Sequence, residues 1–192
     1  MKLRSAHASG WALFSAAVHR DERGWLMEAL RIDALRAHAG PVQIVQQNLS
    51  HSRRGVLRGL HYQLGAPQGK VVQVLAGRVH DVIVDLRRGS PDLGTSFALE
   101  LCAADAQMLW VPPGFAHGFL ALEDSLLLYG LTQAWDARLD RAIRWDSPGL
   151  AIEWPLAGAE PILSERDRRA PTFGEAELFE HGAFDDGPHS TG

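Results

Sequence analysis

The fold class of this chain is decided by two β-branched runs, Lys70-Val71-Val72-Gln73-Val74-Leu75 and Val79-His80-Asp81-Val82-Ile83-Val84-Asp85-Leu86, joined by the short turn Ala76-Gly77-Arg78. Valine and isoleucine favour extended backbone, and the glycine turn between the two runs separates one strand from the next. Similar short runs stand on either side, at 42–48, 97–101, 108–111, 118–122 and 125–129. Short strands at this regular spacing predict an all-β protein, and their number suits a jelly-roll barrel.

The two ends of the chain carry weaker signals. We expect a short helix with Asp33 as its N-cap, and a helical turn capped by Ser164, because an acid, Asp167, stands three residues further on. The tail from about Glu175 is rich in glycine and polar residues and is expected to fray. With 192 residues and no internal repeat, we expect residues 1–192 to form one barrel domain with short flanking helices.

Composition excludes several classes of function. The formal net charge of −4 gives no reason to expect nucleic acid as a partner. Cys102 is the single cysteine, so there is no internal disulfide framework, and its apolar neighbours favour a core residue over a nucleophile. No apolar run approaches the roughly 20 residues that span a bilayer, and the N-terminus lacks the apolar core of a secretory signal. We therefore expect a cytoplasmic protein without a membrane partner.

A polar site is predicted in Gly55-Val56-Leu57-Arg58-Gly59-Leu60-His61-Tyr62-Gln63, which sets an arginine and a histidine into an apolar run. Strand alternation puts Leu57, Gly59 and His61 on one face and Arg58 on the other, unless a glycine bends the strand. Burying either charged side chain is costly without a partner, and folds carry that cost mainly where they need chemistry.

Other ionisable side chains in apolar or glycine-rich settings extend this site. Lys70 follows a glycine into a strand, where an ammonium would stabilise a developing oxyanion, and Tyr129 ends an apolar strand as a candidate proton donor. His61 would serve as a base near neutral pH if a carboxylate orients it, and the candidate carboxylates are Asp81, Asp85 and Asp167. The structural alternatives are a buried histidine bonded to a backbone carbonyl, a surface lysine and a core tyrosine.

The histidines and arginines of the chain bear on two kinds of ligand, a metal ion and a phosphate group. His61 and His117, which follows a Pro-Pro-Gly turn, are too few for a usual metal centre, and Gln63 stands where metal-binding barrels of this kind carry another histidine. We therefore expect no metal. A guanidinium grips phosphate with two parallel donors, so arginines favour a phosphate-bearing ligand, with solvated surface charge as the alternative. The candidates are Arg23, Arg53, Arg54, Arg58 and Arg88.

A series of motifs runs in a fixed order from about Asp21 to Pro171. They are Asp21-Glu22-Arg23-Gly24, Gln46-Gln47-Asn48-Leu49-Ser50, the run 55–63 quoted above, Gln68-Gly69-Lys70, the segment 81–91, Trp110-Val111-Pro112-Pro113-Gly114-Phe115-Ala116-His117-Gly118-Phe119, Ile143-Arg144-Trp145-Asp146-Ser147-Pro148 and Leu163-Ser164-Glu165-Arg166-Asp167. Together they resemble the dTDP-4-dehydrorhamnose 3,5-epimerase family, also called the dTDP-4-keto-6-deoxyglucose epimerases.

The resemblance implies a cupin-like jelly roll without a metal or other cofactor, usually a homodimer that exchanges strands, with N-terminal residues acting in the partner's site. It implies that His61 is the base, Asp167 its carboxylate partner and Tyr129 the proton donor, while Lys70 holds the C4 oxygen of a nucleotide-linked sugar. The positions that match substrate-binding residues of the family are Arg23, Glu28, Gln46, Asn48, Arg58, His117, Trp135, Asp140 and Arg166.

The implied reaction suits these residue types. A ketone at C4 acidifies the hydrogens on C3 and C5, so removing one gives an enolate whose charge Lys70 would stabilise. Inversion needs proton removal on one face of the ring and proton return on the other, which calls for two groups such as His61 and Tyr129. We therefore expect an epimerase that inverts C3, C5 or both in a 4-keto-6-deoxy sugar nucleotide.

Departures from the family pattern keep alternatives open. Trp135 stands where a tyrosine is common, Asp140 where glutamate is common and Arg166 where lysine is common. An indole cannot transfer a proton as a phenol does, so a single epimerisation at C3 or C5 is one alternative. A non-catalytic nucleotide-sugar-binding cupin is a second, and a metal-dependent cupin isomerase or oxygenase is a third.

Overall fold

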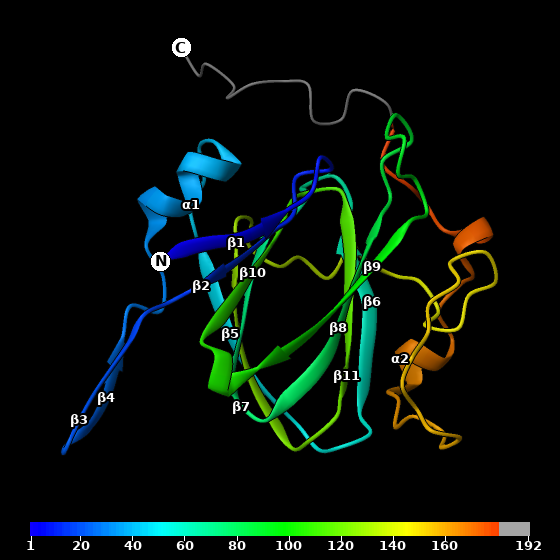
Figure 1. Ribbon diagram of the computed structural model, residues 1–192. Coiled ribbons are helices and arrows are strands. Elements are labelled where there is room, and N and C mark those ends of the chain that lie inside the picture. Colours follow the sequence, from blue (N-terminus) through cyan, green and yellow to red (C-terminus); the bar gives the residue numbers. More distant parts are fainter. Residues whose placement is uncertain (181–192) are drawn as a thin grey trace, which may run out of the picture.

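The computed structural model describes residues 1–180, which form two antiparallel sheets that face each other and close into a barrel (Figure 1). The six-stranded sheet runs in the order β1 (Lys2–Ala6), β2 (Ala12–Ser15), β10 (Gln107–Val111), β7 (Lys70–Ala76), β12 (Ser125–Leu131) and β5 (Gln46–Ser52). The five-stranded sheet runs in the order β13 (Asp140–Ala142), β6 (Leu57–Gln63), β11 (Phe115–Ala121), β8 (Arg78–Asp85) and β9 (Ser96–Cys102). The predicted all-β jelly-roll barrel is confirmed.

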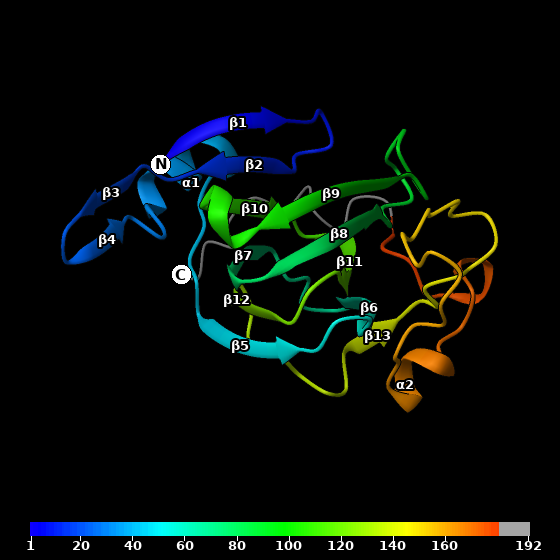
Figure 2. The ribbon, with the colours of Figure 1, turned by 60° about the horizontal axis from the view of Figure 1, so that its bottom comes forward.

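A separate hairpin, β3 (Val18–Asp21) and β4 (Gly24–Met27), stands away from the barrel (Figures 1 and 2). The sequence did not predict this hairpin, and it placed one strand too early. The run 42–48 was expected to be extended, whereas the strand is Gln46–Ser52, because Val42 and Ile44 pack with the core on the outside of the six-stranded sheet. The other predicted strands are confirmed within a few residues.

Three apolar clusters hold the layers together. The barrel interior contains Val72 of β7, Ile83 of β8 and Phe119 of β11. Helix α1 (Ile32–Ala39) covers the outer face of the six-stranded sheet with Leu35, whose burial contributes roughly 1.5–3 kcal/mol. The C-terminal segment covers the outer face of the five-stranded sheet through residues such as Ile143. Apolar clusters thus lie inside the barrel and on the outer face of each sheet.

The helices are short, as expected, and their N-caps differ from each other. The predicted cap at Asp33 is wrong, because α1 begins at Ile32 after an extended Arg31 that makes no side-chain cap, and Asp33 lies inside the first turn. The cap at Ser164 is confirmed: its Oγ accepts the backbone N–H of Asp167, 3.1 Å away, at the start of α2 (Glu165–Arg168). The remaining helical segments are 3₁₀ turns at Ala103–Asp105 and Phe173–Glu175.

The chain up to Glu180 packs onto the barrel instead of fraying. The backbone N–H of Phe179 donates to the carbonyl of Leu86, and the Phe179 ring lies edge-on to Tyr62 with centroids 5.7 Å apart. The expected fraying from Glu175 therefore does not hold for 175–180, and the rest of that tail lies outside the described residues. Within residues 1–180, no helix is both long and apolar enough to cross a membrane.

Candidate active site

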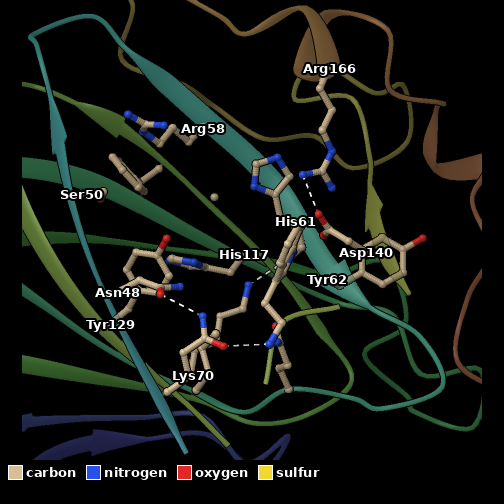
Figure 3. A pocket seen from close by; sticks show the side chains of 16 residues that line it. Asn48, Ser50, Arg58, His61, Tyr62, Lys70, His117, Tyr129, Asp140 and Arg166 are labelled. Atoms are coloured by element: carbon tan, nitrogen blue, oxygen red, sulfur yellow. Dashed lines mark hydrogen bonds and ion pairs between the residues drawn. The ribbon is translucent and has the colours of Figure 1, made fainter. Parts of the chain in front are cut away.

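A cavity of about 410 Å³ opens inside the barrel, between the two sheets (Figure 3). Most of the predicted site residues line it: Gln46, Asn48, Arg58, His61, Lys70, His117, Tyr129, Trp135, Asp140 and Arg166. Sequence reasoning missed other lining residues, namely Ser50, Tyr62, Gln68, Gly118, Phe119 and Leu131. Strand alternation could have found Ser50, since it shares a face of β5 with Gln46 and Asn48. Arg53, Arg54 and Arg88 lie outside this cavity.

A bulge in β6 brings Arg58 and His61 to the same cavity. In the register with β11, His61 faces His117 and Arg58 faces Phe119, so three steps along β6 match two along β11. The extra residue reverses the alternation, and the two side chains that simple alternation separates both reach the pocket. Gly59 permits this because its φ is +113° and a Cβ there would lie 2.6 Å from Cα of Gly118.

His61 is paired with Asp167, one of its three candidate carboxylates. Nε2 of His61 lies 2.6 Å from Oδ1 of Asp167, and the hydroxyl of Ser164 donates to the other carboxylate oxygen at 2.7 Å. An ionised carboxylate only accepts, so Nε2–H donates, and the neutral ring keeps its lone pair on Nδ1. Asp85, another of the three candidates, instead accepts hydrogen bonds from Arg87 and Ser90.

The electrostatics of this pair favour a base that is ready at neutral pH. Burial lowers the pKa of His61 below its ordinary value, and the opposing effect of Asp167 does not cancel it. Burial works to raise the pKa of Asp167, but the hydrogen bonds from His61 and Ser164 outweigh it, and the pKa of that carboxyl is lowered. A neutral imidazole therefore stands beside a carboxylate that would stabilise it once protonated.

Lys70 is buried at the start of β7, and its ammonium donates to the backbone carbonyl of His61 at 3.0 Å. Burial lowers the pKa of Lys70 to about 8, against the raising effect of Asp140 and Asp81. The side chain is thus mostly charged at pH 7 and loses its proton as the pH rises through about 8. The alternative reading as a surface lysine is wrong.

Tyr129 approaches the cavity from the sheet opposite His61. It lies on β12 of the six-stranded sheet, whereas His61 lies on β6 of the five-stranded sheet. Figure 3 shows both side chains and that of Lys70 around one space. Within the described chain the Tyr129 hydroxyl has no hydrogen-bond partner, so it is available to a bound molecule. The arrangement sets a phenol and an imidazole on opposite sides of the cavity.

Polar side chains at the mouth are held by one another. The backbone N–H of Trp135 donates to Oε1 of Gln46 at 2.9 Å, and Nε2 of Gln46 donates to Asn48 at 2.9 Å. Asp140 and Arg166 form an ion pair at 2.8 Å on the other side. The guanidinium of Arg58 donates through Nε to Ser52 at 2.9 Å. These contacts fix a polar rim with cationic groups suited to a charged ligand.

Arg23 and Glu28 do not line the cavity of their own chain. Arg23 lies at the tip of the β3–β4 hairpin and pairs with Asp21, and Glu28 pairs with the N-terminal ammonium at 3.1 Å. Among residues 1–180, no group of three or more histidine, cysteine or acidic side chains is arranged to hold a metal ion.

A family model described as dTDP-4-dehydrorhamnose 3,5-epimerase matches residues 6–175. A dTDP-4-dehydrorhamnose 3,5-epimerase of Pseudomonas aeruginosa is 46% identical over 169 residues, which cover 87% of this chain and 93% of that protein.

The structure of this chain is also similar to solved structures of sugar-nucleotide epimerases. The epimerase RmlC from Legionella pneumophila, in complex with dTDP-4-keto-L-rhamnose, is 34% identical with a TM-score of 0.89 and covers 94% of this chain and 98% of its own. ChmJ, a 3′-monoepimerase from Streptomyces bikiniensis in complex with dTDP-quinovose, is 31% identical with a TM-score of 0.84 and covers 94% of this chain and 93% of its own.

Proposed function

This chain belongs to the dTDP-4-dehydrorhamnose 3,5-epimerase family, and we propose that it inverts both C3 and C5 of a dTDP-linked 4-keto-6-deoxy sugar, with His61 as the base. It is an isomerase of the carbohydrate epimerase type with a cupin-like fold. The observation that supports the residue roles is the placement of His61 and Tyr129 on opposite sheets around one cavity, with the Lys70 ammonium beside them.

The proposed reaction begins at the carbon next to the C4 ketone. Nδ1 of His61 removes the proton, and Asp167 stabilises the imidazolium that forms. The electrons move into an enolate whose oxygen is stabilised by the ammonium of Lys70. The Tyr129 hydroxyl then gives a proton to the opposite face of the same carbon, and exchange with solvent resets both groups. A second round at the other carbon completes the double epimerisation.

Substrate binding is assigned to the rim. Arg58 suits the diphosphate because its guanidinium lines the cavity and is fixed by two contacts, from Nε to Ser52 and from Nη2 to the carbonyl of His51 at 3.1 Å. Gln46, Asn48 and His117 offer hydrogen-bonding groups to the sugar and nucleotide, and Asp140 with Arg166 closes the side next to β13.

Solvent deuterium exchange tests the proposal. The protein is incubated in D₂O with dTDP-4-keto-6-deoxyglucose, and NMR follows deuterium at C3 and C5 and the configuration of the product. We expect exchange and inversion at both carbons, and loss of both in His61→Asn. Exchange at neither carbon by the wild-type protein would refute this substrate, and tight binding without exchange would support the non-catalytic binding alternative.

A single epimerisation is the second candidate, and Trp135 is the observation that favours it. Its side chain is 53% exposed at the cavity mouth and carries no phenol. If this position limits the reaction, the wild-type protein exchanges one carbon, and Trp135→Tyr gains exchange at the other. Equal exchange at both carbons in the wild-type protein excludes this candidate.

We also propose that the active form is a homodimer in which the β3–β4 hairpin serves the site of the second copy. Trp25 and Leu26 on this hairpin are 60% and 72% exposed, which is unusual for large apolar side chains in a hairpin that stands alone. Strand β5 lies at an open edge of its sheet and carries Leu49, 61% exposed. An open edge and an apolar hairpin are the features that strand exchange uses.

Mixing inactive variants tests this sharing. Arg23→Ala lies on the hairpin and His61→Asn lies in the cavity, so a dimer of one variant with the other contains one intact site. We expect activity to return to about a quarter of the wild-type level when equal amounts are co-refolded and subunits pair at random. Light scattering should give twice the chain mass. A monomer, or mixtures that stay inactive while Arg23→Ala alone is impaired, would contradict the proposal.

A further inference from the structure

A second histidine–carboxylate pair lies in the wall of the cavity, on β11 and β8. His117 lines the cavity, and its Nε2 is 2.8 Å from Oδ2 of Asp81 (Figure 3 shows His117). In the β11–β8 register Asp81 faces Phe119, two residues after His117, so Asp81 and His117 are diagonal neighbours on one face. The mechanism above gives Asp81 no role.

The surroundings of Asp81 make its burial costly. Its side chain has 0% exposure, and its neighbours on the same face of β8 are Val79 and Ile83 of the interior core. One carboxylate oxygen contacts His117, but Oδ1 has no hydrogen-bond partner among the described residues. An apolar side chain would fill this place at lower cost, so the carboxylate points to a function.

Contacts connect this carboxylate with Lys70: the Lys70 ammonium donates to the carbonyl of His61, His61 stands opposite His117 on β11, and His117 contacts Asp81. The charged and titratable side chains that line the cavity with Lys70 are Arg58, His61 and Tyr62 from β6, His117 from β11, Tyr129 from β12, Asp140 from β13 and Arg166 from α2, and Asp81 of β8 contacts His117. Both Asp140 and Asp81 raise the pKa of Lys70 against the effect of burial. Asp140 is already paired with the guanidinium of Arg166 at 2.8 Å, whereas within residues 1–180 the side-chain partner of Asp81 is His117.

We propose, resting on the function proposed above, that Asp81 is a positioning residue that fixes the ring of His117 and supplies the buried negative charge that keeps the Lys70 ammonium protonated beside the C4 oxygen. The carboxylate accepts from Nε2–H of His117, which leaves Nδ1 as an acceptor for a sugar hydroxyl. Neither role requires Asp81 to touch the substrate.

The protonation of Lys70 can be measured directly by NMR, because Lys2 and Lys70 are the two lysines of the chain. In protein labelled with ¹³C at lysine Cε, NMR follows both signals with pH, and the exposed Lys2 is an internal reference. We expect Lys70 to titrate near pH 8 in the wild-type protein and about one pH unit lower in Asp81→Asn. The basic limb of kcat/KM for deuterium exchange should move by the same amount.

Asp85→Asn is the matched control. Asp85 is as buried as Asp81 on the same strand, but it binds Arg87 and Ser90. This variant should leave the Lys70 titration in place. An unmoved Lys70 signal in folded Asp81→Asn, or an equal shift in Asp85→Asn, would overturn the proposal. If Asp81→Asn does not fold, Asp81→Ser gives the same readings, since serine offers His117 a hydroxyl without charge.

The two proposals fail separately. A wild-type protein that exchanges neither carbon refutes the function, while the lysine titration still reports on Asp81. A wild-type protein that exchanges normally, with an unmoved Lys70 signal in Asp81→Asn, refutes the role of Asp81 alone.

Discussion

His61 and His117 stand directly opposite each other on the neighbouring strands β6 and β11, and each imidazole is hydrogen-bonded to its own buried aspartate. His61 reaches Asp167 at the start of α2, and His117 reaches Asp81 on β8. The two pairs differ in their surroundings, since the hydroxyl of Ser164 also donates to Asp167, whereas one oxygen of Asp81 has no hydrogen-bond partner among the described residues. The first pair suits proton transfer, and the second suits a fixed charge.

Replacing Asp167 with asparagine should slow deuterium exchange by about 10²- to 10⁴-fold, because the imidazolium loses the charge that stabilises it and the tautomer is no longer enforced. The loss should fall on kcat rather than KM, as measured by steady-state kinetics.

Ser164→Ala is the control for that substitution. It removes the hydroxyl that donates to Asp167 and caps α2, so we expect a thermal stability loss of about 1 kcal/mol and a far smaller kinetic effect. Wild-type kcat in Asp167→Asn would show that this carboxylate has no part in the reaction.

The rate of exchange should have a bell-shaped dependence on pH. His61 acts as the neutral base, and burial lowers its pKa, so the acidic limb should fall below pH 6.5. Lys70 acts as the charged form, and its pKa of about 8 sets the basic limb, above which activity declines. Measurement of kcat/KM between pH 5 and 10, in a buffer series of constant ionic strength, checks both limbs. Full activity sustained at pH 10 would contradict the role of Lys70.

Tyr129→Phe should separate exchange from inversion. His61 would still remove a proton and return deuterium to the same face, so we expect exchange to persist while the yield of inverted sugar falls by about 10²-fold or more. Chiral analysis of the product beside NMR of the exchanged carbons makes this measurement.

The other tyrosine of the chain, Tyr62, is the matched control for this substitution. It also lines the cavity, but its hydroxyl donates to the carbonyl of Glu177 at 2.6 Å. Tyr62→Phe should therefore lower stability and leave the ratio of inversion to exchange unchanged. Equal loss of inversion in Tyr129→Phe and Tyr62→Phe would show that Tyr129 is not the specific proton donor.

Gly59→Ala should destabilise the protein by about 2–5 kcal/mol, because the left-handed backbone and the new Cβ each add strain. The Cβ would lie 2.6 Å from Cα of Gly118 and 2.7 Å from the carbonyl oxygen of His117. Chemical denaturation monitored by tryptophan fluorescence measures the difference.

Gly149→Ala distinguishes the two contributions, since Gly149 has a φ of +90° with nothing within 4 Å of its Cβ position. This variant should lose about 1–2 kcal/mol from backbone strain alone. Similar losses in both variants would mean that the close approach of β6 and β11 does not require glycine at 59.

The strands of the barrel were predictable because they depend on local side-chain preferences. Valine-rich runs such as 70–75 and 79–86 favour extended backbone wherever they pack, and each forms a strand although the two lie in different sheets. The same local preference gave a wrong strand start for the run 42–48, because Val42 and Ile44 have β-forming side chains but pack with the cluster that contains Leu35 of α1. The N-terminal hairpins were missed because β1 and β3 are short and largely exposed, so they carry no apolar pattern.

The sequence by itself determined the all-β class, the cap at Ser164 and the group of ionisable residues from which a site is built, because these depend on neighbours in the chain. It left His61 with three candidate carboxylates, and the family resemblance singled out Asp167. The pairing of His117 with Asp81, and the bulge that turns Arg58 toward His61, required the tertiary structure. These features arise where strands distant in sequence meet, and such contacts are set by packing across the whole barrel and not by any local preference.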